Sequence, residues 1–468
     1  MMRGLAIAAA GAVLLAASGC TTVGPNYKRP AVTTPDQFFH AASLPGTPAG
    51  ANAAADTASL GDEKWFELFG DPALQTLVRT ALANSFDARI AASRILQAQE
   101  QVGITRANEF PTVSAGPGFS SQKLPGFAFS YFQLQALVSW TPDFWGRYRR
   151  ATEAARATEA AAEWNRREIL STVVENVAVA YFQMRELDAE LETSKQTLAA
   201  RRDSLALTQT LLNGGATGLL DVRQAEQLVE EAAQTIPDIE RQIGVQEDLI
   251  STLIGDNPHA IPRGEAFTAQ QAPPEIPAGL PSRLLERRPD IRAAEQQLAA
   301  ATANIGVARA QLFPSLPLTG GAGIESTNFA GLFTGPGAAW NFSAPFTEPI
   351  FNHGALRSNV RLTEAQQQQA LLTYQQAIQT AFRQVSDALI AYRKYREFRE
   401  HQEKLTAAAE DAARLSDLRY RGGATSYLEV LTSQTNYFAA QLNLSRAQLN
   451  ERLTLVQLYA ALGGGWET

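Results

Sequence analysis

The sequence has very little cysteine and histidine, and this excludes several kinds of site. Among 468 residues there is one cysteine, Cys20, so no disulfide can form within the chain. The four histidines lie far apart and show no metal-ligand spacing. No motif of a hydrolase nucleophile, a zinc protease or a phosphate-binding loop is present. The sequence therefore predicts no enzyme, no cofactor and no metal site.

Charged residues are also scarce. They make up 19% of the chain, and the formal net charge is -7. An acidic protein is a poor ligand for a phosphate backbone, so we expect no nucleic-acid partner. Alanine and glutamine are abundant instead, and this bias favours long, closely packed helices over a mixed globular core.

Glycine and proline are absent from two long stretches, Arg147 to Asn213 and Ala355 to Arg421. As a helix, each stretch would span about 100 Å, and helices this long indicate coiled coils. Apolar residues recur in both at alternating steps of four and three, which predicts a stripe that is buried against neighbouring helices. The stripes are Val173, Val177, Ala180, Met184, Leu187 and Leu191, and Ile378, Phe382, Val385, Leu389 and Tyr392.

The sequence contains an internal repeat. Residues 86–113 align without gaps to residues 289–316, and NGGATGLLDV at 213–222 matches RGGATSYLEV at 421–430. In each copy a helix is followed by two strands, the long helix, the GGAT turn and a helix of about half the length. We therefore predict two structural repeats, 70–254 and 282–461, joined by a linker at 255–281 that is rich in proline and glycine.

Four segments alternate between apolar and polar residues, at about 112–123, 129–140, 316–326 and 337–347. Their period and length are typical of transmembrane β-strands, although a hairpin on a soluble core would alternate similarly. Unpaired backbone groups in hydrocarbon cost several kcal/mol each, so a spanning sheet needs closed edges. Four strands are too few for a barrel, and the chain is expected to close one with copies of itself. Two copies would give eight strands and three would give twelve.

The N-terminus has the features of an export signal. Arg3 precedes the apolar stretch 5–17, and the small residues Ser18 and Gly19 precede Cys20, which predicts a signal peptide at 1–19. A cysteine in this position resembles the bacterial lipobox, in which the thiol is acylated; cleavage without acylation is the alternative. Thr21 follows Cys20, and by similarity to bacterial sorting rules this favours the outer membrane.

Taken together, these features resemble outer membrane efflux proteins of the TolC type, in the lipoprotein (NodT-like) branch that serves tripartite RND drug-efflux pumps. The resemblance is carried by GCTTVGPNYKRP at 19–30, ERRPDIRAAEQQL at 286–298 and RYRGGATSYLEVLTSQ at 419–434. It implies a mainly α fold with transmembrane β: a trimeric 12-stranded β-barrel, four strands per chain, continued by a long periplasmic α-helical barrel. Segments 20–69, 255–281 and 462–468 would form an equatorial region.

The resemblance also implies a function and partners. The protein would be a passive outer-membrane exit duct for multidrug efflux and antibiotic resistance. It would form a homotrimer that meets a periplasmic adaptor (membrane fusion) protein and an inner-membrane RND-type pump. Acylated Cys20, carrying palmitate, would anchor it to outer-membrane lipid. One alternative is a duct for type I-like secretion. Another is a lipid-anchored periplasmic coiled-coil adaptor, which would lack the four strands and carry its helical hairpin once.

The two GGAT turns are predicted to form the periplasmic tip, where the adaptor would dock. These tip residues are Gly214, Gly215, Ala216, Thr217, Gly422, Gly423, Ala424 and Thr425. By resemblance, a tyrosine before the turn and acidic residues after it form a gate. The gate candidates are Tyr420, Glu429, Asp221, Arg419, Arg421 and Thr432. Thr432 stands where some relatives carry a second acidic residue, which leaves the charge of the gate smaller.

Helix capping offers a second interpretation of the same acidic residues. Ser426 and Glu429 have the spacing of a capping box, in which each side chain bonds the other residue's backbone amide. Acidic groups at helix starts also suit the helix dipole, and this applies to Asp221. Asp417, one turn before Arg421, is expected to form a surface ion pair with it. Capping and gating remain open for Asp221 and Glu429.

Overall fold

The computed structural model describes residues 22–35, 38–39, 59–62, 64–68, 70–264, 267, 281–334 and 337–466. The predicted signal peptide and Cys20 lie outside the described residues, as do parts of segments 20–69 and 255–281. The chain divides into two compact units. The first holds 93–164 and 293–376 with the N-terminal residues up to 31, and the second holds 32–92, 165–292 and 377–468.

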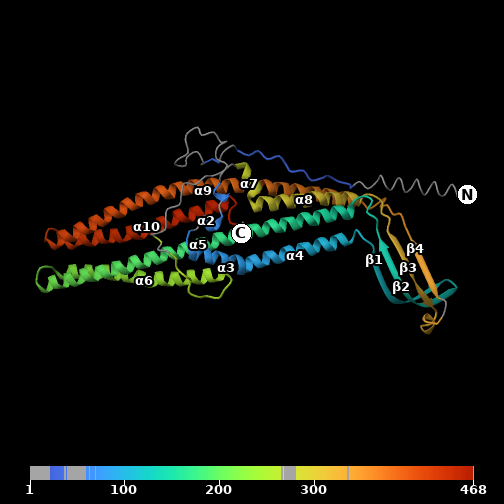
Figure 1. Cartoon of the computed structure of the whole chain (residues 1–468), viewed down its shortest axis with the longest axis horizontal. Helices are drawn as coiled ribbons and strands as arrows, with labels where there is room; N and C mark the ends of the chain where they lie inside the picture. Colours follow the sequence, from blue (N-terminus) through green and yellow to red (C-terminus); the bar gives the residue numbers. More distant parts are fainter. Residues whose placement is uncertain are drawn as a thin grey trace. The chain divides into compact units, whose positions relative to one another are not determined.

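The first unit contains one antiparallel sheet in the order β1-β2-β3-β4 (Figure 1). Its strands are β1 (Thr112–Leu124), β2 (Phe127–Trp140), β3 (Leu318–Ser326) and β4 (Ala338–Ser343), with the short helix η3 (Ala330–Leu332) between the last two. All four predicted strands are therefore present. The prediction of 337–347 for β4 is too long, because Pro345 has no amide to donate to a ladder. Pairing resumes only as an isolated bridge between Ser315 and Thr347.

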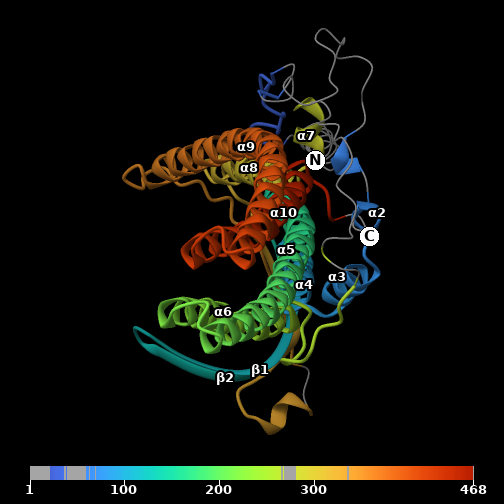
Figure 2. The same ribbon diagram turned by 90° about the vertical axis from the view of Figure 1, so that its left-hand side faces the viewer.

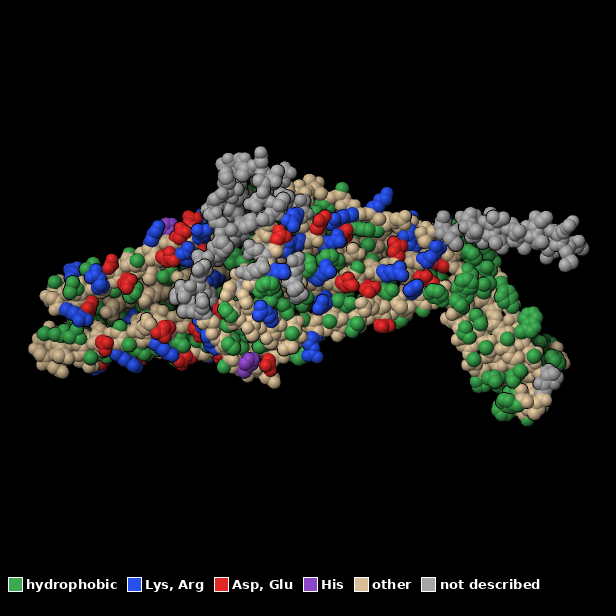
Figure 3. Space-filling view, in the orientation of Figure 1, with side chains coloured by type: hydrophobic (Ala, Val, Ile, Leu, Met, Phe, Trp, Pro, Cys, Tyr) green, Lys and Arg blue, Asp and Glu red, His purple; other side chains and the backbone are tan. Residues whose placement is uncertain are grey.

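The register of the sheet places the apolar residues of all four strands on one face. Residues directly opposite each other in a ladder share a face, so each row of partners reads across the sheet. Two such rows are Val113–Val138–Gly320–Phe342 and Ala115–Ala136–Ala322–Trp340. Within this chain Trp340 is 81% exposed and Val113 is 71% exposed. Figure 3 shows hydrophobic and uncharged side chains over the visible face of the sheet, a surface that suits lipid.

The helices confirm the two structural repeats. The pairs α4 (Phe86–Ala107) and α8 (Pro289–Ala310), α5 (Arg147–Asn213) and α9 (Ala355–Arg421), and α6 (Leu219–Leu253) and α10 (Tyr427–Ala461) have 22, 67 and 35 residues in both copies. Shorter elements are η2 (Leu60–Asp62), α2 (Trp65–Leu68), α3 (Pro72–Asn84) and α7 (Pro281–Arg287). Figures 1 and 2 show α6 returning along α5 and α10 returning along α9.

None of the helices in the described part of the chain combines the length and hydropathy of a membrane-spanning helix.

Burial along α5 follows the predicted stripe at first and then departs from it. Val173, Val177, Ala180 and Met184 are buried, as expected. Leu187 and Leu191 are only half-buried, whereas Glu186, Glu190 and Ser194 are buried in their place. The heptad prediction is therefore wrong beyond Met184, where the buried side of the helix moves onto polar residues.

In the first unit the N-terminal segment lies across the start of α5 and the middle of α8. A Cβ on Gly24 would come within 2.5 Å of the Cα of Gly306, so both positions need glycine. Arg150 donates hydrogen bonds to the carbonyl of Gly24 at 3.4 Å and to the Asn26 side chain at 2.7 Å. Burial raises the pKa of Tyr27, whose hydroxyl donates to Glu295 at 3.2 Å. We name residues 22–29 the N-terminal strap.

Candidate functional site

The two predicted tip turns have the same backbone. In the first, the amide of Gly215 bonds the carbonyl of Leu212 at 2.9 Å, and the amide of Ala216 bonds that of Leu211 at 2.9 Å. In the second, the corresponding bonds join Gly423 to the Tyr420 carbonyl and Ala424 to the Arg419 carbonyl, both at 2.9 Å. This pattern is the Schellman motif, which requires a left-handed residue after the helix. Gly215 has φ 72° and Gly423 has φ 71°, so both glycines are required by conformation.

The two turns meet through a threonine and a tyrosine. Thr217 lies in the first turn and Tyr420 just before the second, and their hydroxyl oxygens are 3.4 Å apart. The Thr217 hydroxyl also donates to the carboxylate of Asp221. Tyr420 contacts Tyr427 edge to face, with 5.1 Å between ring centroids. The structure thus brings the gate candidates Asp221 and Tyr420 together through Thr217.

A small apolar cluster lies directly beneath this contact. It is formed by Ala225 and Leu228 of α6 with Tyr427 and Val430 of α10, all at most 1% exposed. Leu205, Tyr420 and Leu431 pack against it. The cluster joins the α5–α6 hairpin to the α9–α10 hairpin, so the two turns are held together by burial as well as by polar contacts.

Glu429 lies between two donors of the second turn. Its carboxylate accepts a hydrogen bond from the Thr425 hydroxyl and an ion pair from Arg419 at 2.9 Å. Ser426 is the N-cap residue of α10, but its side chain makes no capping hydrogen bond. The predicted capping box is therefore wrong, because Thr425 and Arg419 occupy the carboxylate that would have closed it.

Two other candidates form contacts of their own. Arg421 pairs with Asp417 at 2.7 Å, which confirms the predicted surface ion pair. The hydroxyl of Thr432 donates to the carbonyl of Leu428 in its own helix at 2.9 Å. Neither of these two contacts reaches the first turn. Gly214, Ala216, Gly422 and Ala424 are exposed.

The sequence did not identify Arg201, a buried arginine of α5 that contacts both hairpins. Its guanidinium donates to the Leu228 carbonyl at 2.6 Å and pairs with Glu231 at 3.0 Å. It also lies over the ring of Phe438 in α10, 5.0 Å from the centroid. Burial lowers the pKa of Arg201. Arg202 follows directly in the sequence, and nothing in the local pattern indicates which of the two is buried.

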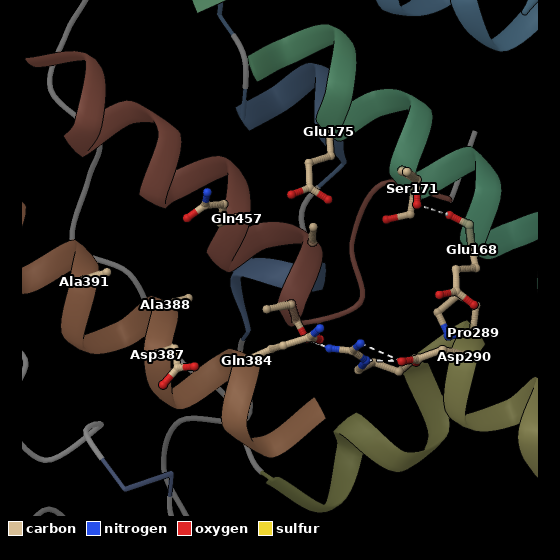
Figure 4. Close-up of a pocket in the computed structure, with 14 residues that line it drawn as sticks. Glu168, Ser171, Glu175, Pro289, Asp290, Gln384, Asp387, Ala388, Ala391 and Gln457 are labelled. Atoms are coloured by element: carbon tan, nitrogen blue, oxygen red, sulfur yellow. Dashed lines mark hydrogen bonds and ion pairs between the residues drawn. The ribbon is translucent and has the colours of Figure 1, made fainter. Parts of the chain in front are cut away.

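A cavity of about 500 Å³ lies elsewhere in the second unit, between α5, α9, α10 and the start of α8. Glu168, Glu175, Asp290 and Asp387 line it, as Figure 4 shows, and Arg288 pairs with Asp290 at 2.6 Å. Burial raises the pKa of both Glu168 and Glu175. In the described residues no group of acidic, histidine or cysteine side chains is arranged to hold a metal ion. Pro289 and Asp290 begin α8.

Comparisons with known proteins identify the family of the chain. The family model for outer membrane efflux proteins matches residues 77–256 and 280–464. The chain is 35% identical to the probable efflux pump outer membrane protein TtgC of Pseudomonas putida, over 96% of this chain and 93% of that one. It is 33% identical to the probable outer membrane lipoprotein SilC of Salmonella typhimurium, over 96% of each chain.

Among solved structures, the open state of the MtrE outer membrane channel of Neisseria gonorrhoeae aligns with a TM-score of 0.84. It is 31% identical and covers 96% of this chain and 99% of its own. The mainly α fold with four strands and two repeats is thereby confirmed as that of outer-membrane channels. The chain belongs to the outer membrane efflux protein family, and it is an efflux channel of the outer membrane.

Proposed function

We propose that three copies of this chain form the exit duct of a tripartite multidrug efflux system. In the described chain β1 and β4 each pair along one edge only. In a membrane those free edges must find partners, and neighbouring copies supply them. Three copies give twelve strands, enough to enclose a lumen. The exposed apolar face of the sheet supports this arrangement.

The proposed duct is passive and works with two partners. A periplasmic adaptor docks on the two turns, and an inner-membrane RND-type pump supplies energy and selects the cargo. The name of TtgC, an efflux pump outer membrane protein, supports this role. Segments 20–69, 255–281 and 462–468 form the equatorial region of this scheme. Acylation of Cys20 anchors the chain, in keeping with the name of SilC, an outer membrane lipoprotein.

The duct is proposed to be gated where the two turns meet. The contact between Thr217 and Tyr420 is the observation that carries this proposal, because it ties one hairpin to the other. The carboxylate of Asp221 accepts from the Thr217 hydroxyl in this contact, and Arg419, next to Tyr420 in the sequence, pairs with Glu429 within the second turn. Opening the duct would require α9 and α10 to move away from α5 and α6, which breaks this contact.

The test is single-channel conductance of the purified full chain in a planar bilayer. Tyr420→Phe combined with Glu429→Ala removes a hydroxyl from the contact with Thr217 and a carboxylate from the second turn, and conductance should rise. Asp417→Asn is the matched control, since it breaks an ion pair that involves neither Thr217 nor Tyr420. Unchanged conductance in the double variant, or an equal rise in the control, would count against the gate. A monomer in detergent would count against the trimer.

A further inference from the structure

A pair of buried carboxyl groups lies on α5, where that helix contacts α10. Glu186 and Glu190 are one helical turn apart, and they are 5% and 4% exposed. Glu186 is hydrogen-bonded to Glu190, and Arg446 of α10 approaches Glu190 with 2.9 Å between Nε and Oε1. Among the described residues, Oε1 of Glu186 has no hydrogen-bond partner. None of these residues belongs to the gate described above.

The charges around the pair do not balance if both carboxyls are ionised. The charged groups that act on Glu186 in the described part of the chain are Glu190 of its own helix and Arg446 of α10. One arginine offsets one negative charge, and a second buried carboxylate would be strongly repelled by the first. A hydrogen bond between two carboxyl groups also requires a proton on one of them. The geometry therefore favours a pair that holds one proton.

We propose that Glu186, Glu190 and Arg446 form a proton-dependent latch that holds α10 against α5. We call these three residues the carboxyl latch. It deepens the proposed function and rests on it, because α5 and α10 belong to the two hairpins whose turns meet at Thr217 and Tyr420. Each hairpin is continuous from the latch to its turn, so separating α10 from α5 loosens the contact at the gate.

The direction of the pH dependence follows from the protonated pair. Burial and the neighbouring Glu190 raise the pKa of Glu186 from 4.5 to about 8 while the latch is closed. In an opened latch water reaches the carboxyl, and its pKa returns toward the ordinary value. Between these two values the closed state holds a proton that the open state has released, so a rise in pH favours opening. The latch is strongest below pH 4.5 and weakens up to about pH 8.

The shared proton can be observed directly. Infrared spectra of the full chain should show the carbonyl stretch of a protonated carboxyl that disappears as pH rises through about 8. The band is isolated by subtracting the spectrum of Glu186→Gln, which keeps the size of the side chain and cannot titrate. Glu192→Gln is the matched control, because Glu192 is an exposed residue of the same helix. If the wild type and Glu186→Gln give the same spectra at every pH, the shared proton does not exist.

Coupling to the gate is tested by conductance across the same pH range. The open-to-closed ratio of the wild type and of Glu192→Gln should rise by up to about tenfold per pH unit. Glu186→Gln should stay closed and show no such rise. An equal pH response in wild type and Glu186→Gln overturns the latch even if the duct conducts. If no variant conducts at any pH, including Tyr420→Phe with Glu429→Ala, the proposed function fails, and with it the coupling of the latch to the gate.

Discussion

The two tip turns share a backbone and a hydrogen bond from a threonine to a carboxylate four residues later, and they differ in the side chains around these features. Both end a 67-residue helix in the same Schellman motif, with the same hydrogen-bond lengths. Leu211 and Leu212 precede the first turn, where Arg419 and Tyr420 precede the second. The backbone is therefore fixed by the two glycines, and the residues around them are free to take different roles.

One aligned position shows this difference most clearly. Leu219 begins α6 and is 57% exposed, whereas Tyr427 begins α10 and is 1% exposed. The second turn therefore supplies a side chain to the cluster between the hairpins, and the first turn leaves its own for solvent or a partner. At this position the second repeat thus contributes to the buried cluster, and the first repeat offers a more accessible apolar surface.

The largest expected effect is at that position. Tyr427→Ala should lower the free energy of local opening of the first turn of α10 by about 3–5 kcal/mol, because it empties a buried site. Leu219→Ala should change the corresponding value for α6 by less than about 0.5 kcal/mol. Amide hydrogen exchange of the purified chain, read by mass spectrometry, measures both values. Similar losses of local stability for Tyr427→Ala and Leu219→Ala would contradict this difference between the two turns.

Because the two turns have the same backbone, equivalent glycine substitutions should destabilise them equally. Gly215→Ala and Gly423→Ala should each destabilise their turn by about 1–2 kcal/mol, because alanine disfavours positive φ. Open space surrounds both glycines, so no clash with a described residue is added to this cost. Gly214→Ala and Gly422→Ala serve as controls, since neither has positive φ. Hydrogen exchange at the turns should give matching losses; a clear difference between the two turns would show that their backbones are not equivalent.

Thr217 and Thr425 occupy equivalent positions in the two turns. Substituting each in turn tests contact between the hairpins separately from contact within one hairpin. Thr217→Val removes a hydroxyl that faces both Asp221 and Tyr420. A hydrogen bond contributes about 0.5–1.5 kcal/mol, so the open-to-closed ratio should rise roughly two- to tenfold. Thr425→Val removes a hydroxyl that bonds only Glu429 of its own hairpin in the described contacts. Single-channel recording should show no rise in the open-to-closed ratio for Thr425→Val. An equal rise in both variants would contradict the role of Thr217 as the contact between the hairpins.

The smallest effect is expected from Arg419→Gln. The pair with Glu429 is well exposed, with side chains 57% and 40% accessible. Exposed ion pairs contribute about 0.2–1 kcal/mol and are screened by salt. The loss of stability of the second turn, measured by amide hydrogen exchange, should therefore vanish at high ionic strength. A loss that persists in high salt would show that Arg419 acts through packing.

The backbone of this molecule is largely predictable from its sequence. The bounds of α5 and α9 follow to the residue from stretches that lack glycine and proline. Gly146 and Gly354, both with positive φ, stand just before them. The strands follow from a period of two, although β3 begins two residues later than predicted and β4 is shorter because Pro345 interrupts its ladder. Strong local signals decide each of these features.

The contacts between the hairpins are not predictable in this way. Thr217 and Tyr420 are 203 residues apart, and local periodicity holds no information about which side chains of distant turns will meet. On α5, Leu187 is the expected buried residue and Glu186 the observed one. Adjacent residues differ by about 100° around a helix, so a rotation of that size exchanges a leucine for a carboxyl on the buried side. The heptad pattern does not resolve that rotation.

The N-terminal strap has a consequence for the symmetry of the molecule. Gly306 and Gly103 are equivalent in the two repeats. Gly306 is crossed by Gly24, while nothing in the described chain comes within 4 Å of a Cβ placed on Gly103. The strap occurs once, and of these two equivalent glycines it covers only the one in the second repeat. The N-terminal strap therefore distinguishes α8 from α4, its equivalent in the first repeat.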